Sequence, residues 1–250
     1  MAQAGLSFFI SPAPMLDALR RPLRWLLRRA SRSCRHTPEG RIYLGDGQPV
    51  MVFPAFGGGP ESTAGLRGIL AEAGFAAYDW GLGVDTGCAE RGLNQRLRRL
   101  EEQVIEVFEA ERRAVTLLGW GLSGVYAREV AKRTSPLVRQ VITLSTPFNT
   151  AADPSRQCAM LRSLESSHAR IEAAVRHRLR QRPPVPCTSI YSTSDGVVPW
   201  EMCVENESAM SENVQVPAAT HLELAGHPRV LEIVTDRLAQ PEDGWRPFHA

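Results

Sequence analysis

The sequence lacks the features that mark several common classes of protein. Lysine is almost absent, because Lys132 is the only one among 29 basic residues. The five cysteines are widely spaced and form no Cys-x-x-Cys pair, which argues against a disulfide framework or a zinc site. No apolar run approaches the roughly 18–20 residues that a membrane-spanning helix needs. We therefore expect free thiols in the reducing cytoplasm, no bound metal and no membrane span.

Signatures of nucleotide binding are also missing. The glycines of Asp79–Gly87 and of the Gly57-Gly58-Gly59 stretch do not form the Gly-x-Gly-x-x-Gly pattern of dinucleotide sites. The single lysine, Lys132, falls in a predicted helix rather than in a phosphate-binding loop. We expect no cofactor.

Positive charge is concentrated near the start of the chain. Residues 1–40 hold seven Arg and two acidic residues, whereas the remaining 210 residues hold 22 basic and 25 acidic groups. The body is thus mildly acidic, and we expect no nucleic-acid partner. The break at Thr37-Pro38-Glu39-Gly40 divides a basic arm, residues 1–37, from a domain at 38–250.

Within the arm, residues 15–30 place leucines at helical spacing with Arg on the opposite face. A basic amphipathic helix of this kind can lie on an anionic membrane surface. We therefore expect a cytoplasmic protein that can attach to the membrane periphery through this helix. A helix docked on the body and a disordered tail are the alternatives, and Pro22 weakens the helix prediction.

From residue 50 onward, short apolar runs alternate with longer helical patterns. This alternation predicts an α/β domain with a mostly parallel sheet flanked by helices. The predicted strands are Val50–Phe53, Phe75–Tyr78, Val115–Leu118, Val138–Leu144, Cys187–Tyr191 and Val214–Val216. The predicted helices cover residues 61–73, 93–110, 122–133 and 229–238.

Residues 150–186 interrupt the alternation. They contain no strand-like run, hold seven Arg and end in Pro183-Pro184-Val185-Pro186. An insertion of this length between two strands predicts a short helical cap, with an ordinary surface helix pair as the alternative.

The segment Val115–Arg128 reads as an apolar strand, a glycine-dense turn and a helix. It resembles the nucleophile elbow of the α/β-hydrolases, in which small residues let strand and helix approach closely. Gly119 and Ser123 occupy those small positions, and Gly121 stands at the tip where the family carries its serine. Ser123 is the remaining candidate nucleophile, and a small packing residue in the first helical turn is its alternative role.

An acid and a base follow in the chain order of that family. Asp195 comes after a predicted strand and precedes Val197-Val198-Pro199, like the family's acid loop, although Asp195-Gly196 alone would also make a simple turn. His221 precedes the last helix at the spacing of the family's histidine. His227 is the competing base, but it lies against a helix start, where the dipole disfavours an imidazolium.

Several stretches together resemble a bacterial, lipase- or esterase-like group of α/β-hydrolases over residues 40–248. They include Pro54-Ala-Phe-Gly, Trp80-Gly-Leu-Gly, Gly119-Trp-Gly-Leu-Ser-Gly and the Asp195 and His221 loops. The resemblance implies an oxyanion hole built from the backbone N–H groups of Phe56 and Leu122.

It also implies an α/β-hydrolase fold and the hydrolysis of acyl esters or thioesters by the Asp195–His221 pair. The nucleophile is then Ser123 or a water beside Gly121. A non-catalytic protein of the same fold, binding an acyl or apolar ligand or a protein partner, is the alternative.

Overall fold

The computed structural model describes residues 34–38, 40–86, 92–149, 173–242 and 244–248. The predicted amphipathic helix at 15–30 lies outside this part of the chain, and so does most of the predicted cap at 150–186. Within the described residues, none of the helices combines the length and the hydropathy needed to cross a membrane.

A small antiparallel hairpin precedes the main sheet. Strand β1 (Cys34–Thr37) pairs with β2 (Gly40–Tyr43). The sequence places residues 34–37 in the arm, whereas in the structure they form this hairpin. The backbone N–H of Tyr43 donates to Oγ1 of Thr235 at 3.1 Å, which fastens the hairpin to the last helix.

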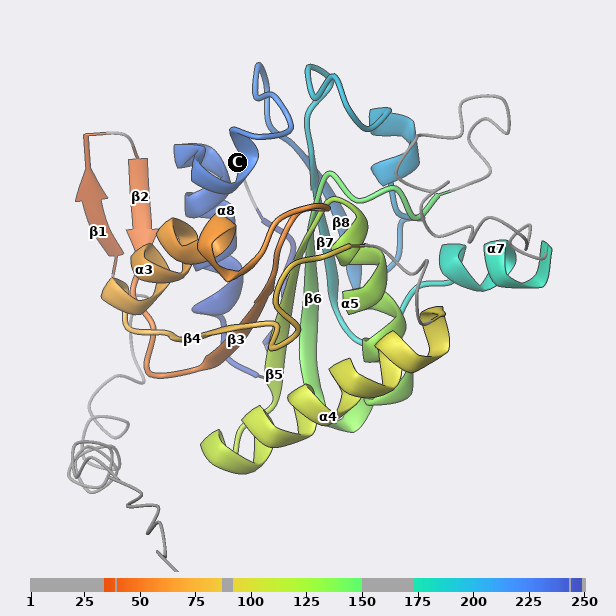
Figure 1. Cartoon of the computed structure of the whole chain (residues 1–250). Helices are drawn as coiled ribbons and strands as arrows, with labels where there is room; N and C mark the ends of the chain where they lie inside the picture. The colour runs from red at the N-terminus through yellow and green to blue at the C-terminus, as the bar shows by residue number, and fades with distance from the viewer. Residues whose placement is uncertain (1–33, 39, 87–91, 150–172, 243, 249–250) are drawn as a thin grey trace, which may run out of the picture. The chain divides into compact units, whose positions relative to one another are not determined.

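The main sheet has six strands in the order β4-β3-β5-β6-β7-β8, and every neighbouring pair is parallel (Figure 1). Its strands are β3 (Pro49–Phe53), β4 (Ala76–Asp79), β5 (Val115–Trp120), β6 (Val138–Leu144), β7 (Cys187–Tyr191) and β8 (Ser211–Gln215). Five of the six lie close to the predicted runs. The last, predicted at Val214–Val216, begins three residues earlier, at Ser211.

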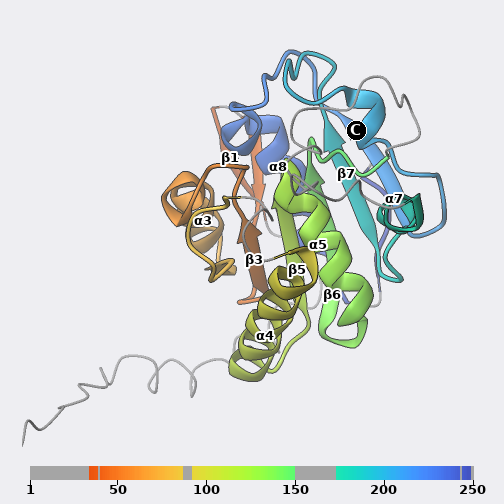
Figure 2. The same cartoon turned by 45° about the vertical axis from the view of Figure 1, so that its right-hand side comes forward.

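Helices cover both faces of this sheet (Figure 2). The longer elements are α3 (Ala64–Glu72), α4 (Leu93–Glu111), α5 (Leu122–Arg133), α7 (Ala173–Arg180) and α8 (Pro228–Leu238), and the short 3₁₀ turns are η1 (Pro60–Thr63), η2 (Ser135–Leu137), η4 (Trp200–Cys203) and η5 (Leu224–Gly226). Successive side chains of β3 point to opposite faces of the sheet, and each face has its own hydrophobic core. Met51 and Phe53 pack with α4 and α5 on one face. Val50 and Val52 pack with α3 and α8 on the other. A layer of buried apolar side chains therefore lies between the sheet and the helices on each face.

The order of the strands determines where loops diverge. From β3 the chain moves outward to β4, and it then returns to place β5 on the other side of β3. Ligands of open parallel sheets bind beyond the carboxyl ends of the strands at such a point of reversal. The loops after β3 and β5 flank this position.

Candidate active site

The chain turns sharply at Gly121, between the end of β5 at Trp120 and the start of α5 at Leu122. Gly121 has φ 59° and ψ −130°, a conformation that residues with a Cβ adopt only under strain. Its N–H donates to the Leu144 carbonyl at 2.8 Å, so the turn is fixed to the neighbouring strand β6. The tip of the strand–turn–helix segment is therefore a glycine.

The close approach of strand and helix explains the small residues around this turn. A Cβ on Gly119 would lie 2.4 Å from the Cα of Gly124, and a Cβ on Gly124 would lie 2.0 Å from Oγ1 of Thr146. A larger residue at position 119 would displace the backbone at Gly124, and one at position 124 would displace the side chain of Thr146. These contacts give a physical reason for the glycine density of the segment.

Ser123 lies in the first turn of α5 and is fully buried. Its hydroxyl donates to Oδ2 of Asp85 at 2.9 Å. The other carboxylate oxygen of Asp85 accepts a hydrogen bond from Nη1 of Arg96 at 2.7 Å. Asp85 was not singled out in the sequence, because it stands 38 positions before Ser123 and carries no motif.

Asp195 and His221, predicted as acid and base, meet at the carboxyl edge of the sheet. Nδ1 of His221 lies 2.8 Å from Oδ2 of Asp195, and both side chains are almost completely buried. A second link is made by the backbone, because the N–H of His221 donates to the Asp195 carbonyl at 3.0 Å. The loops after β7 and β8 are thereby held together.

The remaining contacts of Asp195 favour its ionised form. Oδ1 accepts the backbone N–H groups of Val197, at 2.9 Å, and Val198, at 2.6 Å. Burial by itself would raise the pKa of the carboxyl, but the hydrogen bonds from His221 and Val198 outweigh it and the pKa lies below its ordinary value. The Ser145 hydroxyl is also close enough to lower this pKa, although it forms no hydrogen bond of regular geometry.

The orientation of His221 leaves one ring nitrogen for chemistry. Because Nδ1 faces an ionised carboxylate, the proton of the neutral ring belongs on Nδ1 and Nε2 carries the lone pair. Nε2 is buried and has no hydrogen-bond partner among the described residues. The indole Nε1 of Trp120 donates to the His221 carbonyl at 3.1 Å, which ties the histidine loop to the residue just before Gly121.

His227, the competing base, has a different role in the structure. It is the N-cap of α8, and its Nδ1 accepts the backbone N–H of Arg229 at 3.2 Å. This contact satisfies one of the free N–H groups at the helix start.

The two segments predicted to form an oxyanion hole flank the turn. Phe56 lies in the loop after β3, and Leu122 is the first residue of α5, where an N–H has no acceptor within the helix. Since β3 and β5 are neighbours, with Phe53 opposite Gly119, both segments begin at the same edge of the sheet.

Exposed apolar side chains gather on the loops that surround this edge. They follow β3, β4, β7 and β8 and comprise Phe56, Val84, Val197, Trp200 and Leu222. Leu222 is 76% exposed and is adjacent to His221 in the chain. Val84 lies against Gly59, near the loop that holds Phe56. Large apolar side chains that are exposed together mark surfaces that bind apolar groups.

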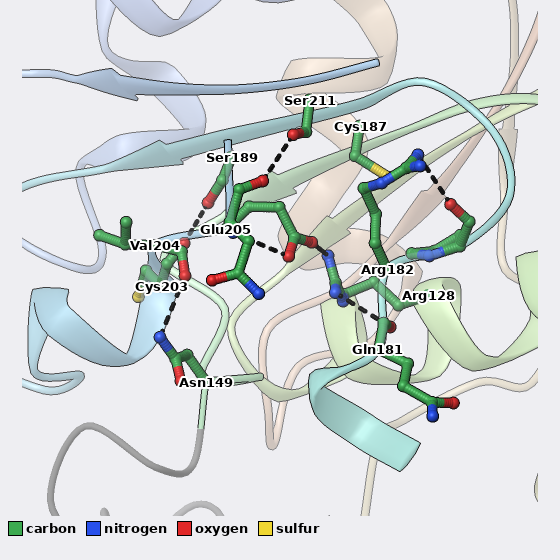
Figure 3. Close-up of polar contacts among 12 residues, drawn as sticks. Arg128, Asn149, Gln181, Arg182, Cys187, Ser189, Cys203, Val204, Glu205 and Ser211 are labelled. Atoms are coloured by element: carbon green, nitrogen blue, oxygen red, sulfur yellow. Dashed lines mark hydrogen bonds and ion pairs between the residues drawn. The ribbon is translucent and has the colours of Figure 1, made fainter. Parts of the chain in front are cut away.

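A buried ion pair braces the far end of the acid loop. Nη1 of Arg128 lies 2.6 Å from Oε2 of Glu205, with both side chains 2% exposed (Figure 3). The guanidinium also lies over the Phe148 ring, 3.7 Å from its centroid. Nearby, Nδ2 of Asn149 donates to the Val204 carbonyl at 3.2 Å. The loop from Asp195 to Glu205 is thus anchored to α5, the helix that follows Gly121.

Among the described residues, no three His, Cys, Asp or Glu side chains form a group that could hold a metal ion. The polar groups at this edge are a carboxylate, an imidazole and backbone N–H groups. This set can accept and return a proton and can stabilise a developing negative charge.

No protein-family model matches the sequence, and no curated protein matches it either. Solved structures do match in fold. A structure of metagenome-derived lipolytic enzymes superposes with a TM-score of 0.60 at 17% identity, over 78% of this chain and 94% of that one. A monoacylglycerol lipase from Paleococcus ferrophilus gives 0.55 at 15% identity, over 77% and 96%.

An α/β-hydrolase from the metagenome of lagoon sediments at Mar Chica gives a TM-score of 0.51 at 17% identity, over 78% of this chain and 92% of that one. The chain therefore has the α/β-hydrolase fold, and the fold prediction is confirmed. At these identities the likeness concerns the fold alone.

Proposed function

We propose that the chain hydrolyses acyl esters or thioesters, with His221 as general base and Asp195 as the carboxylate that orients it. The observation that carries the proposal is the 2.8 Å contact between His221 Nδ1 and Asp195 Oδ2, next to the turn at Gly121. A buried base with its second nitrogen unpaired is suited to accept a proton from a nucleophile.

The nucleophile in this proposal is water rather than a side chain. Gly121 carries no side chain, and the Ser123 hydroxyl is committed to Asp85. His221 Nε2 removes a proton from water while the water oxygen forms a bond to the carbonyl carbon. The carbonyl oxygen then takes a negative charge, and the N–H groups of Phe56 and Leu122 stabilise it.

The intermediate collapses when the carbon–oxygen bond to the alcohol, or the carbon–sulfur bond to the thiol of a thioester, breaks. The imidazolium of His221 returns its proton to the leaving alkoxide, or to the thiolate of a thioester, and a carboxylic acid is released. Asp195 stays ionised and stabilises the imidazolium, consistent with its lowered pKa. With no acyl-enzyme intermediate, the time course has no burst phase.

The apolar side chains around this edge support an acyl substrate. Phe56, Val84, Val197 and Leu222 offer apolar contact on the loops that hold the predicted polar groups. Each Å² of acyl-chain surface that such side chains remove from water contributes about 25 cal/mol of favourable binding free energy. Two of the structures of similar fold are described as lipolytic enzymes and a monoacylglycerol lipase. Those activities belong to those proteins, and they support the choice of an acyl ester as the substrate class.

The test is the hydrolysis of p-nitrophenyl butyrate by the native chain, His221→Ala and His227→Ala. We expect His221→Ala to lose roughly 10²-fold or more of the turnover, the contribution of a positioned general base. His227→Ala is the matched control, because it removes a helix cap that lies six positions further along the chain. An equal loss in the two variants, or no loss in His221→Ala, would contradict the proposal.

A non-catalytic protein that binds an acyl or apolar ligand is the second candidate, and Gly121 is the observation that favours it. In that case p-nitrophenyl butyrate turnover is indistinguishable between the native chain and His221→Ala. Binding of a fatty acid such as octanoate, measured by calorimetry, is then retained in both.

A further inference from the structure

Asp85 contacts both of the segments that the proposed mechanism needs for its oxyanion hole. It lies in the loop after β4 and is fully buried. Oδ2 of its carboxylate accepts the Ser123 hydroxyl at 2.9 Å, and Ser123 directly follows Leu122 at the start of α5. The side chain of Asp85 thus fixes the first turn of that helix.

The backbone of Asp85 fixes the other segment. Its N–H donates to the Gly58 carbonyl at 2.8 Å, and its own carbonyl accepts the N–H of Gly57 at 2.9 Å. These two hydrogen bonds hold the turn that starts at Ala55 and contains Phe56, whose closing bond runs from the Gly58 N–H to the Ala55 carbonyl at 2.8 Å. One residue therefore bridges the loop after β3 and the helix after β5.

Arg96 holds the Asp85 carboxylate in place. Its Nη1 lies 2.7 Å from Oδ1 of Asp85, and its guanidinium carbon lies 5.6 Å from the centroid of the Trp80 ring and 5.2 Å from that of Tyr126. Cation–π contacts with these two rings help to hold the arginine beside Asp85. The carboxylate of Asp85 thus joins α4 to α5, while the backbone of Asp85 holds the loop after β3.

We propose that Asp85 is a positioning residue that sets the N–H groups of Phe56 and Leu122 relative to each other. This inference rests on the proposed function, because the two N–H groups matter only if an oxyanion forms between them. Asp85 itself does not touch the substrate. Preorganised donors stabilise a transition state only while their geometry is held, so a small displacement of either segment reduces kcat.

The test compares Asp85→Asn with Glu212→Gln. Asparagine keeps the size of Asp85 but removes its charge, so the guanidinium of Arg96 loses its buried counter-charge and the Ser123 hydroxyl loses a carboxylate acceptor. Glu212, on β8, is a matched control. Its carboxylate is also buried, and it is paired with Arg237 at 3.0 Å. Both variants therefore lose the charge of a buried ion pair.

The first measurement is steady-state hydrolysis of p-nitrophenyl butyrate. We expect Asp85→Asn to lower kcat roughly tenfold or more with KM unchanged, since a displaced oxyanion donor acts on the transition state alone. Glu212→Gln should keep the native kcat. An unchanged kcat in Asp85→Asn, or a loss that appears in KM instead, overturns the inference.

The second measurement, hydrogen–deuterium exchange, needs no turnover. Asp85→Asn should increase deuterium uptake in peptides covering both 54–59 and 121–125, and Glu212→Gln should increase neither. An increase in only one of these segments, or in neither, overturns the role of Asp85. If the native chain hydrolyses no ester, the proposed function fails, and the exchange result alone decides whether Asp85 holds the two segments together.

Discussion

The indole of Trp120 donates a hydrogen bond from Nε1 to the backbone carbonyl of His221 at 3.1 Å. The donor sits on the last residue of β5, directly before Gly121, and the acceptor belongs to the predicted base. The ring centroids of the two side chains are 6.0 Å apart. The position of the base is therefore set from the strand that leads into the turn.

Replacing Trp120 by Phe removes this donor while keeping an aromatic ring. We expect the free energy of unfolding to fall by about 1–3 kcal/mol, because the buried carbonyl of His221 loses its partner. Urea denaturation measures the change. The control is Trp245→Phe, because Nε1 of Trp245 is buried without a hydrogen-bond partner among the described residues. Equal losses in the two variants would show that the hydrogen bond contributes nothing.

The pKa of Asp195 predicts how stability depends on pH. Burial would raise it, but the hydrogen bonds of the carboxylate lower it below the ordinary value of about 3.9. A carboxyl whose pKa is lower in the folded state stabilises that state above about pH 4, and the contribution disappears as the pH falls through the folded pKa. The native chain should thus lose more stability than Asp195→Asn between pH 5 and pH 3. Parallel profiles in urea denaturation would contradict this assignment.

The buried pair of Arg128 and Glu205 should be sensitive to the loss of one partner. Glu205→Ala leaves a buried guanidinium without its counter-charge, and we expect a loss of about 3–5 kcal/mol in the free energy of unfolding. The control is Glu101→Ala, which breaks a partly exposed pair with Arg133 and should change stability by about 1 kcal/mol or less. Similar effects in both variants would mean that Glu205 does not brace the acid loop.

The buried thiol of Cys187 should be chemically inert near neutral pH. Burial raises its pKa from about 9 to about 11, so almost none of it is thiolate at pH 8. Alkylation by iodoacetamide, followed by peptide mass spectrometry, should modify the half-buried Cys34 well before Cys187. Modification of both at the same rate would contradict the burial of Cys187.

Much of the fold follows from hydrophobic patterning. Continuous apolar runs such as Val50–Phe53 and Val138–Leu144 predict strands buried on both faces, and the structure confirms them as β3 and β6. Strand β8 was less predictable, because its first residues are polar. Ser211 and Glu212 carry no apolar signal, and the buried carboxylate of Glu212 is paired with Arg237 and accepts hydrogen bonds from Thr188 and the backbone of Phe248.

The hairpin of β1 and β2 shows the same limit. Its first strand reads Cys34-Arg-His-Thr37, which is polar and charged, so neither composition nor periodicity predicts a strand there. Its stability comes from contacts with α8, such as the 3.0 Å pair of Arg41 and Glu232. Tertiary contacts of this kind are invisible in a single sequence.

The candidate site was predictable where it follows strand ends. Asp195 and His221 lie in the loops that follow β7 and β8, so the parallel sheet brings them to one edge. The partner of Ser123 was not predictable, because Asp85 reaches it across a loop that no motif identifies. The close approach of strand and helix was expected from the small residues of the turn, and the 2.4 Å between a Cβ placed on Gly119 and the Cα of Gly124 agrees.

We propose that the chain holds the acid, the base and the turn of a hydrolase site while lacking the side chain of the nucleophile. The measurement that decides this is fluorophosphonate labelling of Gly121→Ser, located by peptide mass spectrometry. The φ of 59° will reduce the stability of this variant by about 1–3 kcal/mol, so its folding is checked by circular dichroism.

We predict that the native chain is not labelled, that the variant is labelled at position 121, and that its ester turnover rises roughly 10²-fold or more. Labelling of the native chain at Ser123, or a folded variant with neither label nor added turnover, would contradict the account.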